Sequence, residues 1–191
     1  MILLATFAIL AFLDPYSHLA FPFLVKIDWY DNLITPLREF GSIWTAAIIL
    51  GWIATSDFKR LRQVVAAAAA VVAASLAAHA LKLLVARARP TTAVDPWTFA
   101  AGWGGYADDK YSSFPSGHAA CAFALATAIG FMYPSGKVYI FGLAAACGLS
   151  RILDARHFPT DVLFGALLGY MAARWIVARE GAPWNRSAAG R

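Results

Sequence analysis

Residues 63–86 read QVVAAAAAVVAASLAAHALKLLVA, and this stretch decides the fold of the chain. Nearly every side chain in it is apolar, and Lys82, close to its end, is the only Lys, Arg, Asp or Glu. The stretch exceeds the ~20 residues that an α-helix needs to cross the hydrocarbon core of a bilayer. It therefore predicts a transmembrane helix.

Other apolar stretches of similar character lie on both sides of it. Those at about 42–56, 116–133, 137–153 and 160–178 approach or reach membrane-spanning length. The opening run 1–13 is shorter, and at ~1.5 Å per residue a helix of that length falls short of a ~30 Å core. We count it as a sixth, weaker span. It lacks a basic start and a clean cleavage site with small residues, so a removable signal peptide is the less favoured interpretation.

The composition indicates a membrane protein. Hydrophobic residues make up 60% of the 191 residues and charged residues only 14%, with a positive mean hydropathy. A soluble domain of this length would carry fewer apolar residues. The net charge of +5 does not suggest a nucleic-acid partner, because Lys and Arg are scattered at segment ends. We predict a single membrane-embedded domain over 1–191, an all-α polytopic bundle of about six transmembrane helices.

The basic residues predict how the bundle is oriented. They are Lys59, Arg60 and Arg62 between the second and third spans, and Arg174, Arg179, Arg186 and Arg191 in or after the last span. Because positively charged links stay on the cytoplasmic side, both termini are predicted to be cytoplasmic. The links at about 14–41, 87–115 and 154–159 then lie on the extracytoplasmic face.

Two of these outer links have a pattern of their own. Apolar residues recur at helical spacing over 27–37 among charged ones, which predicts a helix lying in the membrane interface. The link 91–114 is rich in aromatic residues and glycine. It either covers a lipid headgroup or simply anchors the chain at the interface.

Three short polar motifs border the same outer face. In the first, Lys82 and Arg89 are nearly two helical turns apart, so they project from one face of the third span, and Pro90 ends or bends that helix. Both cations can reach one anion. The alternative is that they are snorkelling residues at a helix end, which is the better interpretation for Arg87 and Arg89 taken alone. Lys82 lies deeper, which weakens that alternative.

The second motif is Pro115-Ser116-Gly117-His118. Ser116 is a natural N-cap for the fourth span, and Gly117 lets a ligand approach the backbone of the first turn. Free amide hydrogens at a helix N-terminus bind oxyanions, and His118 lies in the same turn. Taken alone, the motif would be ordinary helix capping.

The third motif joins Ser150-Arg151 to His157 and Asp161. At a spacing of four, the Asp161 carboxylate can accept a hydrogen bond from one imidazole nitrogen and leave the other free to attack. An exposed histidine and an aspartate favouring a helix N-terminus are the alternative. The coincidence of three motifs on one membrane face favours a site for phosphoryl transfer.

The order of these motifs resembles the type-2 phosphatidic acid phosphatase superfamily, which also includes vanadium haloperoxidases and bacterial acid phosphatases. The pattern is Lys, six residues, Arg-Pro; then Pro-Ser-Gly-His; then Ser-Arg, five residues, His, three residues, Asp. Every position is filled here between Lys82 and Asp161. The resemblance covers the chain from the third span onward.

The resemblance implies a role for each motif residue. His157 would attack phosphorus to give a phosphohistidine, Asp161 would orient it, and His118 would protonate the leaving oxygen and then activate water. The groups that would hold the phosphoryl oxygens are Lys82, Arg89, Ser116, the Gly117 amide and Arg151. Cations then take the place of a metal ion, so neither a metal nor another cofactor is expected.

These expectations describe an integral-membrane lipid phosphatase at the extracytoplasmic face of a bacterial inner membrane. Candidate substrates are undecaprenyl diphosphate, phosphatidylglycerol phosphate, phosphatidic acid and the phosphates of lipid A. A lipid phosphotransferase with the same intermediate is the alternative. A transporter is less favoured, because the motif charges gather towards one face and no inverted repeat is visible.

Overall fold

The computed structural model describes residues 2–16, 30–93, 95–100 and 108–179. Its longer helices are α1 (Ile2–Leu13), α3 (Tyr30–Glu39), α4 (Ile43–Ser56), α5 (Leu61–Val85), α6 (Gly117–Met132), α7 (Lys137–Leu153) and α8 (Pro159–Arg179). Over these ranges the structure forms helices and turns and no β-strand longer than one isolated bridge. The all-α prediction is therefore confirmed.

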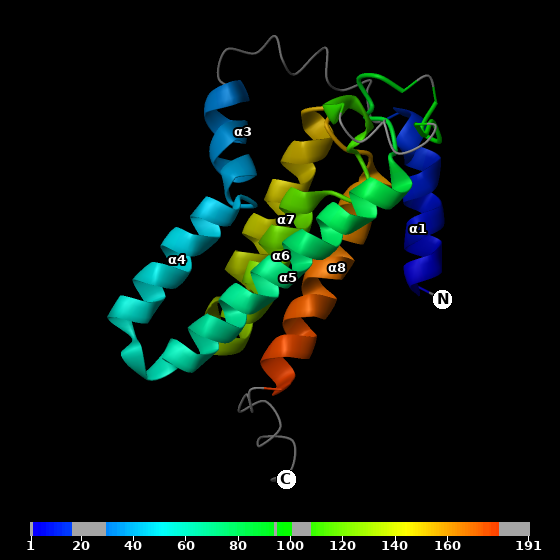
Figure 1. Cartoon of the computed structure of the whole chain (residues 1–191). Helices are drawn as coiled ribbons and strands as arrows, with labels where there is room; N and C mark the ends of the chain where they lie inside the picture. Colours follow the sequence, from blue (N-terminus) through cyan, green and yellow to red (C-terminus); the bar gives the residue numbers. More distant parts are fainter. Residues whose placement is uncertain (1, 17–29, 94, 101–107, 180–191) are drawn as a thin grey trace.

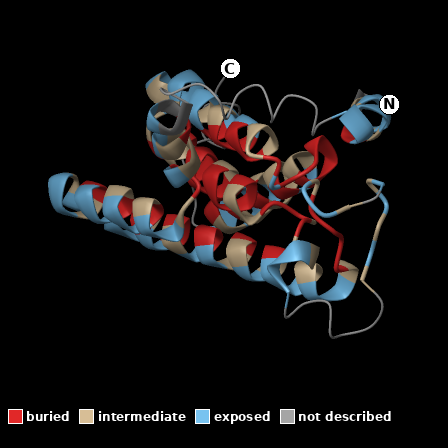
Figure 2. Cartoon of the chain, turned by 90° about the horizontal axis from the view of Figure 1, so that it is seen from above, coloured by how far each residue is buried: buried red, intermediate tan, exposed pale blue. Residues whose placement is uncertain are grey.

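Helix α6 forms the centre of the bundle, between α5, α7 and α8 (Figure 1). Most of its residues are buried, and seen from above the buried residues gather in the middle of the molecule (Figure 2). Small side chains let the helix backbones approach one another closely, as is common in membrane bundles. At Gly165 and Gly169 of α8, an added Cβ atom would overlap with the carbonyl oxygens of Ser116 and Ala120 in α6.

The remaining helices pack around this core. Helix α4 packs along α5, α3 contacts α7, and α1 lies against α8 (Figure 1). Helix α5 ends at Val85 and is capped by Ala86, whose φ of 46° is left-handed and whose N–H donates to the Lys82 carbonyl at 3.0 Å. This turn directs the following residues, Arg87 to Pro90, back over the end of the bundle.

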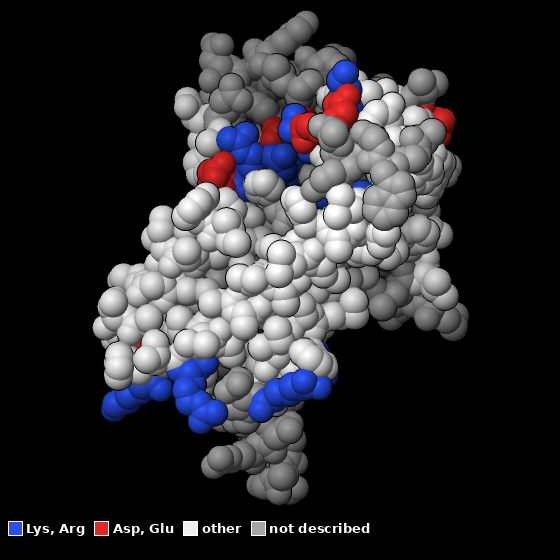
Figure 3. All heavy atoms as spheres, viewed as in Figure 1, with Lys and Arg blue, Asp and Glu red and all other residues white. Residues whose placement is uncertain are grey.

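The face of the bundle seen in Figure 3 carries its charges at the two ends. Figure 3 shows Lys and Arg along one end, a mixture of acidic and basic residues at the other, and a broad belt of uncharged atoms between. Three helical segments are long and apolar enough to cross a membrane, Phe58–Val85, Pro134–Leu153 and Pro159–Arg179. Shorter apolar helices cover Leu4–Tyr16, Ile43–Ser56 and Gly117–Met132. These features are those of a membrane protein.

A helix occupies each of the six apolar stretches of the sequence. That all six cross a membrane, as parts of one domain over 1–191, stays a prediction. The expected interfacial helix coincides with α3 from Tyr30 onward, while residues 27–29 lie outside the described ranges. Much of the aromatic outer link, residues 101–107, also lies outside them.

Candidate active site

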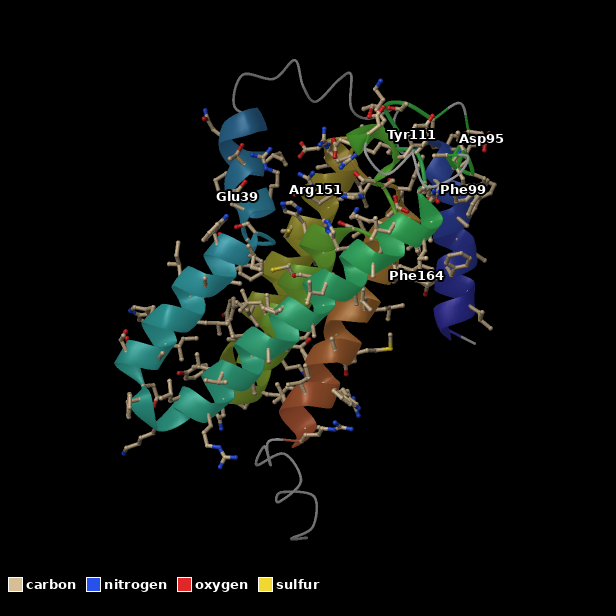
Figure 4. The ribbon with its side chains drawn as sticks, viewed as in Figure 1. Glu39, Asp95, Phe99, Tyr111, Arg151 and Phe164 are labelled. Atoms are coloured by element: carbon tan, nitrogen blue, oxygen red, sulfur yellow. The ribbon has the colours of Figure 1, made fainter. Side chains whose placement is uncertain are left out.

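The three polar motifs meet at one end of the bundle. The Ser116 amide at the start of α6 donates to the Asp161 carbonyl in α8 at 3.0 Å. The Lys82 ammonium of α5 donates to the Ser112 carbonyl, and Arg89 reaches the Arg156 carbonyl at 3.3 Å. Figure 4 shows Glu39, Tyr111 and Arg151 at this same end. Segments far apart in the sequence therefore build a single polar region.

His157 is part of this region and is only 3% exposed. Its Nδ1 atom is 2.7 Å from the Ser113 carbonyl oxygen. Because a carbonyl only accepts, Nδ1 carries the hydrogen and Nε2 keeps its lone pair. Burial, followed by the charges of Lys82, Arg89 and Arg151, holds the pKa of His157 well below its usual value. These effects favour a neutral imidazole, and among the described residues no hydrogen bond to its Nε2 is found.

Asp161 is fully buried, and its carboxylate accepts hydrogen bonds from three groups. Its partners are Arg87 at 2.6 Å, the Ser113 hydroxyl at 2.6 Å and the Phe158 amide at 2.8 Å. The expected direct bond to His157 is not among these contacts. The spacing of four assumed one continuous helix, but α8 begins at Pro159 and His157 lies in the turn before it. The link instead runs through Ser113, which bonds Asp161 by its hydroxyl and His157 by its carbonyl.

The guanidinium of Arg89 is held by the outer link. It donates to the Asp109 carboxylate at 2.6 Å and to the Ser112 hydroxyl at 2.7 Å. Asp109 also accepts from Arg156 at 2.9 Å, so one carboxylate joins two arginines. Burial and the nearby charge of Arg156 lower the pKa of Arg89. This concentration of positive charge favours a bound anion.

Arg151 has a buried hydrogen-bond donor without a partner among the described residues. The side chain is 6% exposed and bonds Asp154 at 3.0 Å. Its Nε–H is buried and has no hydrogen-bond partner among the residues that the structure describes. Leaving a buried donor unsatisfied costs about 1–3 kcal/mol, and more for a charged group. A phosphoryl oxygen is a suitable partner for it.

The first turn of α6 supplies the remaining predicted groups. The Ser116 hydroxyl caps the helix by accepting from the Ala119 amide at 3.4 Å. Beside Gly117 there is open space, where an anion can approach the backbone. His118 is half-buried and lies within the field of Arg151, and no hydrogen bond involves its ring in the described part of the chain. Gly41 packs against it, since an added Cβ would lie 2.6 Å from the His118 carbonyl.

Sequence reasoning missed three residues of this region: Asp14, Arg87 and Ser113. The interpretation of Arg87 as a snorkelling side chain is wrong, because the left-handed turn at Ala86 sends it inward, where it is 2% exposed and pairs with Asp14 and Asp161. Asp14 carried a signal, since a carboxylate at the end of an apolar run is expensive near a membrane. The place of Ser113 depends on long-range contacts that no local pattern reveals.

Known proteins match this chain over the region that carries the site. The sequence model of the PAP2 superfamily matches residues 63–182, which include all eight predicted site residues. The lipid A 1-phosphatase of Rhizobium johnstonii is 33% identical over 100 residues, which cover 52% of this chain and 40% of that protein. Lipid phosphate phosphatase 1 of Arabidopsis thaliana is 39% identical over 81 residues, 34% of this chain and 24% of that protein.

Two further matches add to these. The bacitracin transport permease protein BcrC of Bacillus licheniformis is 37% identical over 65 residues, 34% of this chain and 32% of that protein. The matched regions thus span less than half the length of these relatives. The crystal structure of Aquifex aeolicus LpxE has the same fold, with a TM-score of 0.67 at 24% identity over 85% of this chain and 93% of that one. By its match to the family model, the chain belongs to the PAP2 superfamily.

Proposed function

We propose that this protein is an integral-membrane lipid phosphatase with His157 as its nucleophile. The observation that carries the proposal is the placement of His157: the imidazole is buried, and its Nδ1 lies 2.7 Å from the Ser113 carbonyl oxygen, which leaves the lone pair on Nε2. In the first step, Nε2 forms a bond to phosphorus while the bond from phosphorus to the lipid oxygen breaks. His118 donates a proton to that leaving oxygen.

The second step returns the enzyme to its starting state. Water attacks phosphorus, the bond between phosphorus and Nε2 breaks, and His118 takes up the proton that the water loses. Inorganic phosphate leaves. In this proposal His118, in the first turn of α6, carries a proton at the start of the cycle and regains it at the end.

Cations would stabilise the transition state of both steps. Negative charge develops on three equatorial oxygens of the transferring group, so preorganised donors supply most of the stabilisation. The positive charges of Lys82, Arg89 and Arg151 all lower the pKa of His157, so they lie near the ring. The buried Nε–H of Arg151 has no hydrogen-bond partner among the described residues and can donate to a phosphoryl oxygen. The amides at the start of α6 add a helix N-terminus. With this charge in place, the reaction is expected to be independent of metal ions.

A lipid is the substrate that this placement favours. The polar region lies at the end of apolar helices, so a lipid can present its headgroup while its tail stays in the membrane (Figure 3). The names of the relatives include lipid A 1-phosphatase and lipid phosphate phosphatase. We propose a lipid phosphate of the outer leaflet of a bacterial inner membrane, with the four candidates named above.

A panel assay tests the proposal. Purified protein in detergent is incubated with each of the four lipids in the presence of EDTA, and released phosphate is measured. We expect release from at least one lipid, loss of release in His157→Ala, and normal release in His79→Ala, a matched change at an exposed histidine of α5. Turnover that EDTA abolishes would contradict the metal-free mechanism. Phosphate transferred to an added lipid alcohol in preference to water would identify a phosphotransferase.

A further inference from the structure

We propose that Asp14 and Arg87 are positioning residues that fix the reactive imidazole from a distance, through Asp161 and Ser113. The inference rests on the proposed role of His157 as nucleophile and names the groups that hold it in place. Asp14 lies outside residues 63–182, the region that the family model matches. Through Asp14, the segment that ends the N-terminal helix α1 would therefore help to position the residues of the site.

Arg87 is the centre of the arrangement. Its guanidinium donates to Asp161 at 2.6 Å and to Asp14 at 2.9 Å, and its Nε donates to the Pro96 carbonyl at 2.7 Å. A buried guanidinium is tolerated only when it is paired and hydrogen-bonded, and two carboxylates meet that requirement here. All three nitrogens serve protein groups, in contrast to Arg151. Arg87 is thus placed to hold side chains and not a phosphate.

Asp14 connects this arginine to the start of α8. Its carboxylate is fully buried just after α1 and accepts from the Thr160 hydroxyl at 2.6 Å and from the Thr160 amide at 3.1 Å. The Thr160 hydroxyl oxygen also lies 2.8 Å from an Arg87 nitrogen. Asp14, Arg87 and Thr160 therefore form a closed triangle of contacts next to Asp161. The triangle fixes the first turn of α8 relative to the end of α5.

The two oxygens of Asp161 transmit this position to His157. One oxygen accepts from Arg87, and the other accepts from the Ser113 hydroxyl and the Phe158 amide. Ser113 then holds Nδ1 of His157 through its carbonyl, and Phe158 is the next residue along the chain. The Phe158 ring also lies 4.2 Å from the Arg87 guanidinium. A displacement of Arg87 would therefore move His157 by two routes, through Asp161 and Ser113 and through Phe158.

The proposal separates positioning from anion binding, and kinetics can tell them apart. We would compare wild type with Asp14→Asn and Arg87→Lys, measuring kcat on the active lipid and the inhibition constant of inorganic phosphate, the product, which binds the anion site without bonding to Nε2. A nucleophile displaced by a fraction of an ångström loses rate steeply, since about 1 Å can cost ~100-fold. We expect kcat to fall about 10-fold or more in Arg87→Lys and several-fold in Asp14→Asn, with the phosphate inhibition constant changed by less than about threefold.

A matched ion pair at the other end of α5 is the control. Arg60 and Asp57 are paired at 2.8 Å, and Asp57→Asn and Arg60→Lys should leave both constants unchanged. If kcat and phosphate affinity fell by the same factor in the Asp14 and Arg87 variants, together with the melting temperature, the pair would be structural only. An unchanged kcat would also overturn the proposal.

Nitrogen NMR of the histidines tests the position and protonation of the His157 ring independently of catalytic activity. In protein labelled with ¹⁵N-histidine, the signals that His157→Gln removes identify this ring, and wild type should show it neutral and protonated on Nδ1. Asp14→Asn and Arg87→Lys should shift or broaden these signals, while the Asp57 and Arg60 variants should not. If wild type released no phosphate, the proposed function would fail while these spectra still decided the positioning. Unchanged His157 signals in both variants would refute the proposal that Asp14 and Arg87 position this ring.

Discussion

The protonation state of His157 follows from where this one side chain lies. Burial removes the water that would solvate an imidazolium, and three nearby cations oppose a further positive charge. The proposed nucleophile would thus be ready at neutral pH without an adjacent base to deprotonate it. The same burial links the stability of the fold to pH.

Stability should fall in acid partly through His157. Its pKa is lowered in the folded protein, whereas in the unfolded chain the ring takes up a proton near pH ~6.5. The contribution is therefore complete above that pH and is lost as the pH falls below it. Between about pH 7.5 and pH 5, wild type should lose up to about 2 kcal/mol more than His157→Gln. Melting in detergent at both pH values measures this, and parallel losses in the two proteins would contradict it.

Arg151 should contribute mainly to anion affinity. Its buried Nε–H is unpaired, and a hydrogen bond from a charged donor contributes about 1.5–3 kcal/mol, which is roughly 10- to 100-fold in affinity. Arg151→Gln should raise the orthovanadate inhibition constant by that factor. Arg60→Lys, at the opposite end of the bundle, should not change it. An Arg151→Gln variant that binds vanadate as well as wild type would exclude Arg151 from the anion site.

At the scale of the helices, the close approach of α6 and α8 holds the two ends of the site together. Ser116 and His118 come from α6 and Asp161 from α8, and the glycines of α8 allow their backbones to touch. A methyl group between two backbones cannot be accommodated by turning a flexible side chain. Packing at these glycines is therefore a structural requirement of the site.

Gly169→Ala should destabilise the protein. Its Cβ would overlap with the Ala120 carbonyl oxygen and lie 2.8 Å from the Ala124 amide nitrogen, both backbone atoms. Overpacking of this kind costs about 1–3 kcal/mol. Gly51→Ala is the control, because nothing lies within 4 Å of its added methyl and alanine favours the helix. Melting temperatures in one detergent compare the two, and equal values would mean that α6 and α8 are packed less closely.

The helices of this protein were accessible from the sequence, whereas part of the site was not. Apolar stretches such as 63–86 predict helices because hydropathy alone identifies them, and α5 covers Leu61–Val85. Motifs spaced along helix ends brought His157 and Lys82 into one hypothesis. The same reasoning does not find Arg87. No local pattern predicts the left-handed turn at Ala86, and Asp14, the partner of Arg87, is distant in sequence. Local spacing cannot reveal such tertiary pairings.

For the whole molecule, the distribution of charge predicts its orientation in the membrane. One end of the belt carries basic residues, and the other carries acidic and basic residues together (Figure 3). Lys59 lies in the turn between α4 and α5, far along α5 from Lys82 and the site. Basic links stay in the cytoplasm, so the site should face the opposite side. Lys110 is well exposed near the site, with 64% of its side chain accessible, and Lys59 is exposed at the other end.

Cysteine labelling of intact spheroplasts checks this orientation. The native Cys121 and Cys147 are buried and free, so replacing both with alanine leaves a background on which single cysteines can be read. A membrane-impermeant maleimide should label Lys110→Cys in intact cells and Lys59→Cys only after the membrane is opened. The reverse pattern would place the site in the cytoplasm, where the enzyme would meet newly made lipids of the inner leaflet. Because phosphorylated headgroups cross bilayers slowly without help, the labelled face also decides which pool of lipid phosphate His157 can reach.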